Sequence, residues 1–208
     1  MPMRHCASSC LGDLADVYRE DVELITVARP QADGASSVAL VDRLAELPLQ
    51  ERWTQRCLDA EPVEQRLRSC IPAPLLGPLA ADITLAVSVL HDLLGCASVG
   101  IRLATLHGPM CPRFHVDHVP CRLLVTLAGP GTQWIARDDV DAAAFDARAS
   151  TPPLRDGAAV RQVAAGAWTL LKGGAWQDGF RGVVHRSPPE RSQRLLLSLD
   201  PLFDQGAG

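Results

Sequence analysis

Short apolar runs rich in branched residues dominate the second half of the chain. They lie at 123–127, 132–135, 167–171, 182–185 and 194–199, and turn formers such as Gly129-Pro130-Gly131 separate them. Short apolar runs bounded by Gly and Pro are typical of buried strands. Several such strands in succession predict an all-β sandwich or barrel for residues 99–208.

The first half of the chain has the spacing of helices. Ser36-Ser37 is expected to cap a helix that continues to about Leu47, and 50–67 and 78–94 carry apolar positions three and four residues apart. Gly95 is expected to end the last of these helices. The chain is therefore predicted to be one compact α+β domain, with a flexible tail over 1–12, a helical support region over 13–98 and a β-rich region over 99–208.

Composition narrows the range of partners and compartments. The 208 residues are 47% hydrophobic, enough for one sizeable core, and the formal charge of −4 does not favour nucleic acid as a partner. The seven cysteines lack the spacing of a disulfide scaffold, and no apolar signal-peptide core follows Met1. A cytoplasmic protein is expected. No membrane partner is expected either, because the apolar stretch 83–94 is too short and too polar to span a bilayer.

A candidate metal site begins at His115-Val116-Asp117. Alternate side chains of an extended strand share a face, so His115 and Asp117 are expected to point the same way. His185, on a later strand, would add a second imidazole. Two imidazoles and one carboxylate on one face of an ion are typical of non-haem Fe(II) oxygenases.

The order of these parts resembles the double-stranded β-helix, or jelly roll, of the 2-oxoglutarate and Fe(II) dependent oxygenase superfamily, over roughly residues 99–200. The resemblance implies that His115, Asp117 and His185 hold Fe(II). It also implies that a basic residue on the last strand, here Arg194, binds the carboxylate of 2-oxoglutarate as cosubstrate. The superfamily often has a hydroxyl residue two positions after this arginine, where this sequence has Leu196.

Other cations compete with Arg194 for the oxoacid role. Arg191 and Arg186 are close in sequence. Lys172 is a further alternative, since some members of the superfamily place the carboxylate-binding cation on another strand.

A second candidate metal site shares His115 with the first. Two thiols and two imidazoles suited to Zn(II) occur close together in the sequence, at Cys111, His115, His118 and Cys121. In an extended segment the two cysteines would lie about 30 Å apart, which excludes a compact site unless the flanking prolines bend the chain. Cys111, His118 and Cys121 are therefore kept as accessory metal ligands.

Two functions remain open at this point. The segment from Cys111 to Asp117, with Gly-Pro-Gly-Thr at 129–132 and His-Arg-Ser-Pro-Pro at 185–189, also resembles a bacterial family of unknown function whose members occur beside zinc-homeostasis genes. The chain is expected to be an Fe(II) oxygenase acting on an unidentified small-molecule or protein substrate. The alternative is a non-catalytic protein of zinc binding or homeostasis on the same fold. Arg194 separates them, because an oxygenase needs it inside the roll beside the metal.

Overall fold

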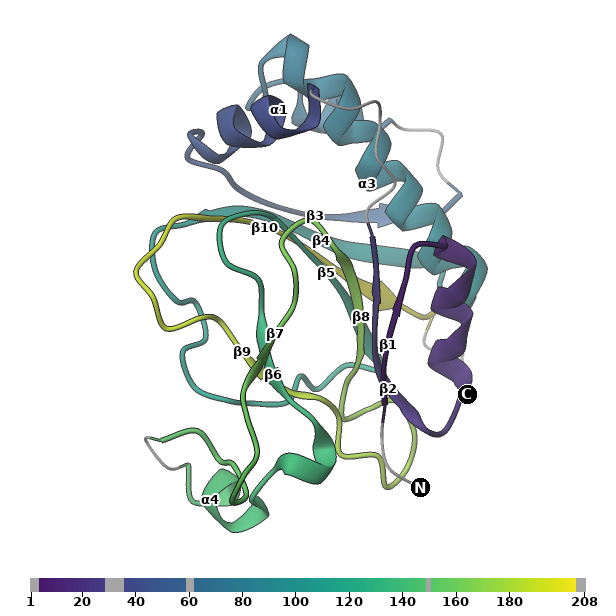
Figure 1. The fold of residues 1–208 in the computed structure, drawn as a ribbon. Coiled ribbons are helices and arrows are strands. Elements are labelled where there is room, and N and C mark those ends of the chain that lie inside the picture. The colour runs from purple at the N-terminus through teal and green to yellow at the C-terminus, as the bar shows by residue number, and fades with distance from the viewer. Residues whose placement is uncertain (1–3, 29–35, 59–61, 149–150, 205–208) are drawn as a thin grey trace.

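Two β-sheets face each other, and helices cover the outer side of the larger one (Figure 1). The computed structural model describes residues 4–28, 36–58, 62–148 and 151–204. The strands are β1 Arg4–Ser8, β2 Val22–Val27, β3 Gln50–Arg56, β4 Ser98–Leu106, β5 Cys121–Ala128, β6 Gln133–Ile135, β7 Arg161–Gln162, β8 Trp168–Lys172, β9 Val184–Arg186 and β10 Arg194–Leu202. The helices are α1 Ser36–Ala45, α2 Val63–Leu67, α3 Ala73–Leu94 and α4 Ala142–Asp146, with 3-10 turns η1 Leu11–Tyr18 and η2 Arg137–Asp139.

The larger sheet has the strand order β1-β2-β8-β5-β10-β4-β3, and the smaller one has the order β7-β6-β9. Only the β1 and β2 pair is parallel among the described strand pairs. The predicted α+β class is confirmed, and both sheets are rich in antiparallel pairs. The apolar runs of the second half form β5, β6, β8, β9 and β10, as expected from their pattern.

The inner strands of the larger sheet are buried on both faces, and the alternation of side chains decides which residues reach the interior between the sheets. On β5, Leu123 and Val125 pack in the core under the helices, whereas Arg122 and Leu124 line a cavity on the opposite face. On β10 the same alternation places Arg194 on the cavity face. We call this space of about 310 Å³ the inter-sheet cavity, because strands of both sheets line it.

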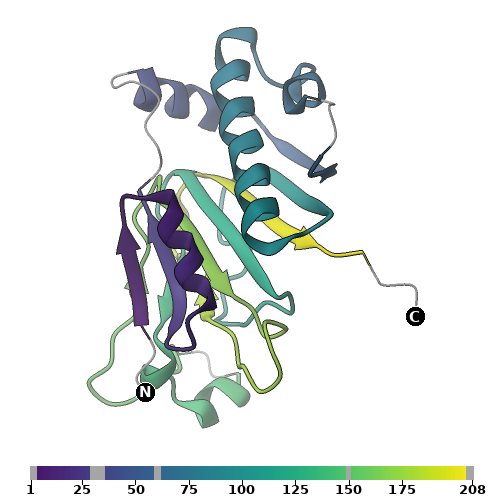
Figure 2. The same ribbon diagram turned by 90° about the vertical axis from the view of Figure 1, so that its right-hand side faces the viewer.

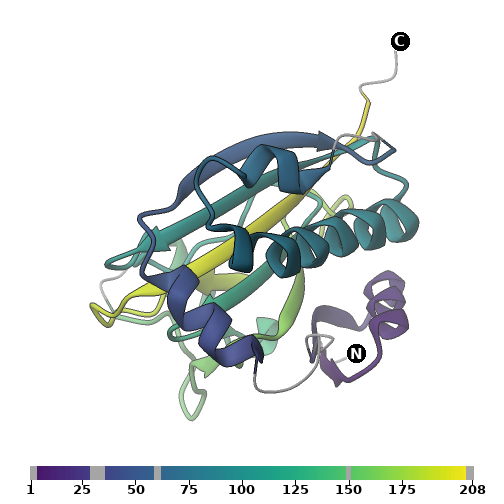
Figure 3. The ribbon, with the colours of Figure 1, turned by 90° about the horizontal axis from the view of Figure 1, so that it is seen from above.

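Helix α3 closes the outer face of the larger sheet (Figures 2 and 3). Its buried face includes Leu79, Ile83 and Leu90, which join the main core, and Gly95 caps it in the left-handed conformation, as predicted. The helix begins earlier than expected, and in length and composition it could cross a membrane. Its packing on β4 and β10 accounts for its apolar character as a core helix.

Three expectations for the first half need correction. Residues 1–12 do not form a loose tail in the described part, because β1 pairs with β2 and His5 hydrogen-bonds Thr26 at 2.8 Å. The helix expected over 50–67 is wrong, because 50–56 form β3 at the edge of the larger sheet and only the short α2 follows. The support region 13–98 therefore also supplies strands. An edge strand such as β3 is exposed on one face and needs few apolar residues. Its sequence therefore shows no clear period of apolar positions.

Candidate metal centre

Two segments far apart in the sequence bring the two histidines together. His115 lies in the connection between β4 and β5, and His185 lies on β9. Their backbones exchange two N–H to C=O hydrogen bonds of 2.9 Å each. This isolated bridge replaces the regular strand expected for His115 to Asp117.

Both imidazoles are oriented by the backbone. The Nδ1 atoms of His115 and His185 lie 3.0 Å from the carbonyl oxygens of Arg113 and Val183, respectively. A proton on Nδ1 that is donated to a carbonyl leaves Nε2 as the electron-pair donor. The Nε2 atoms lie 3.6 and 3.2 Å from the carboxylate oxygens of Asp117.

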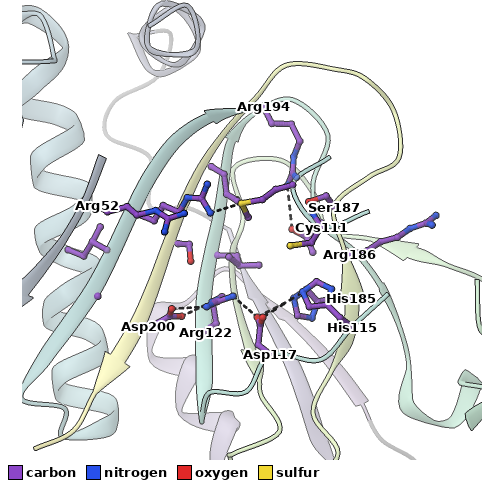
Figure 4. Close-up of a pocket in the computed structure, with 18 of the residues that line it drawn as sticks. Arg52, Cys111, His115, Asp117, Arg122, His185, Arg186, Ser187, Arg194 and Asp200 are labelled. Atoms are coloured by element: carbon purple, nitrogen blue, oxygen red, sulfur yellow. Dashed lines mark hydrogen bonds and ion pairs between the residues drawn. The ribbon is translucent and has the colours of Figure 1, made fainter. Parts of the chain in front are cut away.

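One candidate ligand atom from each of the three residues lies within 4.8 Å of the other two. Figure 4 shows His115, Asp117 and His185 pointing toward one another at the inter-sheet cavity. We call these residues the His-Asp-His group. The sequence predicted that they would meet, and the geometry agrees.

Asp117 also accepts a hydrogen bond from Arg122, a residue that the sequence pattern did not indicate. Arg122 Nη1 donates to Asp117 at 2.7 Å, and its Nε and Nη2 donate to the carboxylate of Asp200 at 2.6 and 2.7 Å. Burial alone would raise the pKa of Asp117, but the contacts with His115 and His185 and the charge of Arg122 outweigh it and hold the pKa well below its usual range. The carboxylate is therefore ionised and ready to act as a ligand.

Arg194 enters the same cavity from β10 (Figure 4). It is 2% exposed, and its Nη2 donates to the hydroxyls of Thr126 and Thr132 at 3.2 and 3.5 Å. These hydroxyls come from β5 and the turn after it, although Leu196 occupies the position where the superfamily often has one. The buried Nε and Nη1 atoms have no hydrogen-bond partner among the described residues.

A buried guanidinium with two unpaired donors is costly, because burial removes water and nothing replaces it. Burial accordingly lowers the pKa of Arg194. A guanidinium with free N–H groups can donate charge-assisted hydrogen bonds to a carboxylate. The site therefore holds a candidate anion-binding residue beside the His-Asp-His group.

The alternative cations lie elsewhere or are engaged. Lys172 donates to the Arg19 carbonyl at 2.8 Å and does not line the inter-sheet cavity. Arg191 is exposed outside it. Arg186 lines the cavity, but its Nε donates to Gln133 and its guanidinium stacks on Phe114, 4.3 Å from the ring centre.

The compact zinc site does not form in the structure. Cys121 is fully buried in the core under the helices, where burial raises its thiol pKa to about 12. His118 is exposed and does not line the cavity, whereas Cys111 does. Pro112 and Pro120 do not bend the segment enough to unite these side chains, and only Cys111 stays near the His-Asp-His group.

The segment that carries Asp117 depends on close contact with Gly173. Gly173 and Gly174 donate backbone hydrogen bonds of 2.8 Å to the carbonyls of Pro120 and Asp117. A methyl group on Gly173 would collide with the Val119 carbonyl oxygen. We expect Gly173→Ala to lower the free energy of unfolding by about 1–3 kcal/mol, the usual cost of overpacking, and to weaken metal binding. Chemical denaturation and metal titration measure the two effects.

Gly77→Ala is the matched control, since a methyl at this exposed position of α3 meets no atom within 4 Å. Alanine is a better helix former than glycine, so the control is expected to gain about 0.5–1 kcal/mol. If Gly173→Ala keeps wild-type stability and metal affinity, the close contact at Gly173 does not position Asp117.

Comparison with known proteins places this site in context. The family model described as Protein of unknown function (DUF1826) matches residues 8–200. None of the curated proteins matches the chain.

Two plant enzymes have similar solved structures. The dioxygenase for auxin oxidation of rice is 13% identical with a TM-score of 0.54, and the match covers 96% of this chain and 83% of that one. Dioxygenase for auxin oxidation 1 of Arabidopsis thaliana, in complex with 2-oxoglutarate, is 11% identical with a TM-score of 0.54, and the match covers 98% and 93%. At these identities the likeness shows the fold alone, which is the jelly roll of 2-oxoglutarate and Fe(II) dependent oxygenases.

Proposed function

The chain belongs to the DUF1826 family, and from its site we propose that it is a non-haem Fe(II), 2-oxoglutarate-dependent oxygenase of the hydroxylase type. The observation that carries the proposal is Arg194. A buried guanidinium with two unpaired donors lines the same cavity as the His-Asp-His group. An oxoacid cosubstrate needs both a metal-binding group and a carboxylate-binding residue in one cavity.

The residues present fit the proposed metal. Two imidazoles with Nε2 turned inward and one ionised carboxylate form the donor set of non-haem Fe(II) oxygenases. The Nδ1 contacts to backbone carbonyls fix both rings, and Arg122 fixes the carboxylate. Bound Fe(II) and 2-oxoglutarate would supply O₂-dependent oxidation of the substrate, with loss of CO₂ from the oxoacid.

The protein's own contribution is orientation and exclusion of water. Arg194 would bind the carboxylate of 2-oxoglutarate far from its oxo group through its unpaired N–H groups. Thr126 and Thr132 accept hydrogen bonds from Nη2 and so fix the orientation of the guanidinium. Leu124 and Leu196 contribute apolar surface to the wall of the cavity.

The non-catalytic alternative predicted that Arg194 would point to solvent. Its burial in the inter-sheet cavity supports the oxygenase over a protein that only binds zinc. The same three ligands can hold Zn(II), so Zn(II) remains the alternative ion.

Calorimetric titration tests the proposal. Because the metal and Arg194 would hold opposite ends of one molecule, we expect 2-oxoglutarate to bind the Mn(II)-loaded chain at least about tenfold more tightly than the metal-free chain. Glutarate, which lacks the oxo group, should show no such dependence. Equal affinity of 2-oxoglutarate for both forms would contradict the proposal.

A further inference from the structure

The inter-sheet cavity carries more positive charge than the proposed cosubstrate needs. Five arginines and two aspartates line it, although the whole chain has a net charge of −4. Arg122 is neutralised by Asp117 and Asp200, Arg186 is engaged by Gln133, and Arg194 is assigned to the oxoacid. Arg52 and Arg102 are left without an assigned role.

These two arginines oppose each other across neighbouring strands. Arg52 on β3 is the register partner of Arg102 on β4 in the antiparallel ladder. Like charges directly opposite each other destabilise a sheet. Burial, and then the charge of Arg52, lower the pKa of Arg102.

Arg52 is exposed and Arg102 is half-buried, so solvent screens part of this repulsion. In the described ranges neither Arg52 nor Arg102 forms an ion pair with a carboxylate. The hydrogen-bond contact of Arg102 Nη1 is with the thioether of Met110, which is a weak acceptor. A pair of cations kept close without an acidic partner is what an anion-binding site requires.

The proposed cosubstrate does not use this charge. The charges of Fe(II) and of the 2-oxoglutarate dianion cancel, so the excess of arginine remains when both are bound. Figure 4 shows Arg52 on the opposite side of the cavity from His115 and His185. A molecule held by Arg52 and Arg102 can therefore extend across the cavity toward the His-Asp-His group.

We propose that the substrate is a small organic anion whose carboxylate or phosphate is bound by Arg52 and Arg102. A cavity of about 310 Å³ fits a small molecule. That this anion is the substrate of the reaction rests on the proposed function. That the anion binds rests on the arginine pair alone.

Paired probes that share an aromatic body test the anion site. Phenyl phosphate, benzoate and the neutral benzamide are titrated by calorimetry into the full chain loaded with Zn(II) and 2-oxoglutarate. We expect phenyl phosphate or benzoate to bind and benzamide not to bind. The anion that binds with the higher affinity shows whether the site prefers a phosphate or a carboxylate.

Arginine variants locate the binding. Arg52→Gln and Arg102→Gln should each lower the affinity for the anion by at least about tenfold. This is the loss expected for a charge-assisted hydrogen bond. Arg56→Gln should leave the affinity unchanged, because Arg56 lies on the same face of β3 but does not line the cavity. Thermal unfolding should show Arg102→Gln to be as stable as wild type or more stable, because a repulsion is removed.

Three outcomes would overturn the anion site. They are an absence of anion binding by wild type at millimolar concentration, equal binding of benzamide, and full affinity in both cavity variants. The titrations are repeated on the metal-free chain without 2-oxoglutarate. If 2-oxoglutarate fails to bind while phenyl phosphate still depends on Arg52 and Arg102, the oxygenase proposal fails and the anion site stands.

Discussion

Replacement of His185 by Ala is expected to abolish stoichiometric binding of Fe(II) and Zn(II) by the chain. His185 supplies one of three ligand atoms that lie within 4.8 Å of one another. Loss of a partner that merely orients a ligand costs about 10–100-fold in metal affinity, so loss of a ligand itself should cost more. Metal content after dialysis and competition with a chromophoric chelator measure the change.

His118→Ala is the matched control for this prediction. His118 follows Asp117 directly but is exposed and lies outside the His-Asp-His group. Its removal should leave metal binding at the wild-type level. Equal metal content in wild type and His185→Ala, or loss of metal in His118→Ala alone, would show that the ion is held elsewhere.

Removal of the Arg194 guanidinium is expected to separate cosubstrate binding from metal binding. In Arg194→Leu, Zn(II) affinity should stay at the wild-type level, because Arg194 is not part of the His-Asp-His group. Binding of 2-oxoglutarate should weaken by about 1.5–3 kcal/mol, or roughly ten- to a hundredfold, the range for hydrogen bonds to charged groups. Arg194→Lys should recover only part of it, because an ammonium lacks the planar fork.

Calorimetry of 2-oxoglutarate binding to the metal-loaded variants gives these affinities. The fold should survive, since replacing a buried charge by an apolar side chain is often neutral or stabilising. Lys172→Met and Arg191→Gln serve as controls, because neither residue lines the inter-sheet cavity. A wild-type affinity in Arg194→Leu would assign the oxoacid to another cation.

The strands of the second half could be predicted because β5, β8 and β10 are buried on both faces. Burial on both faces demands apolar runs, which stand out in a sequence. The strands β1 and β3 lie at the edges of the larger sheet and carry polar sequences such as Gln50–Arg56, so the same signal is missing there. The helix-like spacing over 50–67 therefore predicts a helix where residues 50–56 form a strand.

The His-Asp-His group could be predicted because H-x-D spacing and a late histidine are properties of the sequence. The charged contacts around this group could not be predicted from the sequence. Arg122 meets Asp200 only because β5 and β10 are neighbours in a particular register, and sequence patterns leave that register open. The opposition of Arg52 and Arg102 depends in the same way on the pairing of β3 with β4.

Anaerobic titration of the full chain with Fe(II) and then 2-oxoglutarate tests whether both bind together at the His-Asp-His group. A 2-oxo acid bound to Fe(II) gives a weak visible charge-transfer band, so the band reports metal and cosubstrate in one site. We expect the band to appear in wild type, to saturate at one 2-oxoglutarate per chain and to be absent in His185→Ala. A wild-type chain that binds Fe(II) but develops no band at millimolar 2-oxoglutarate would contradict this expectation.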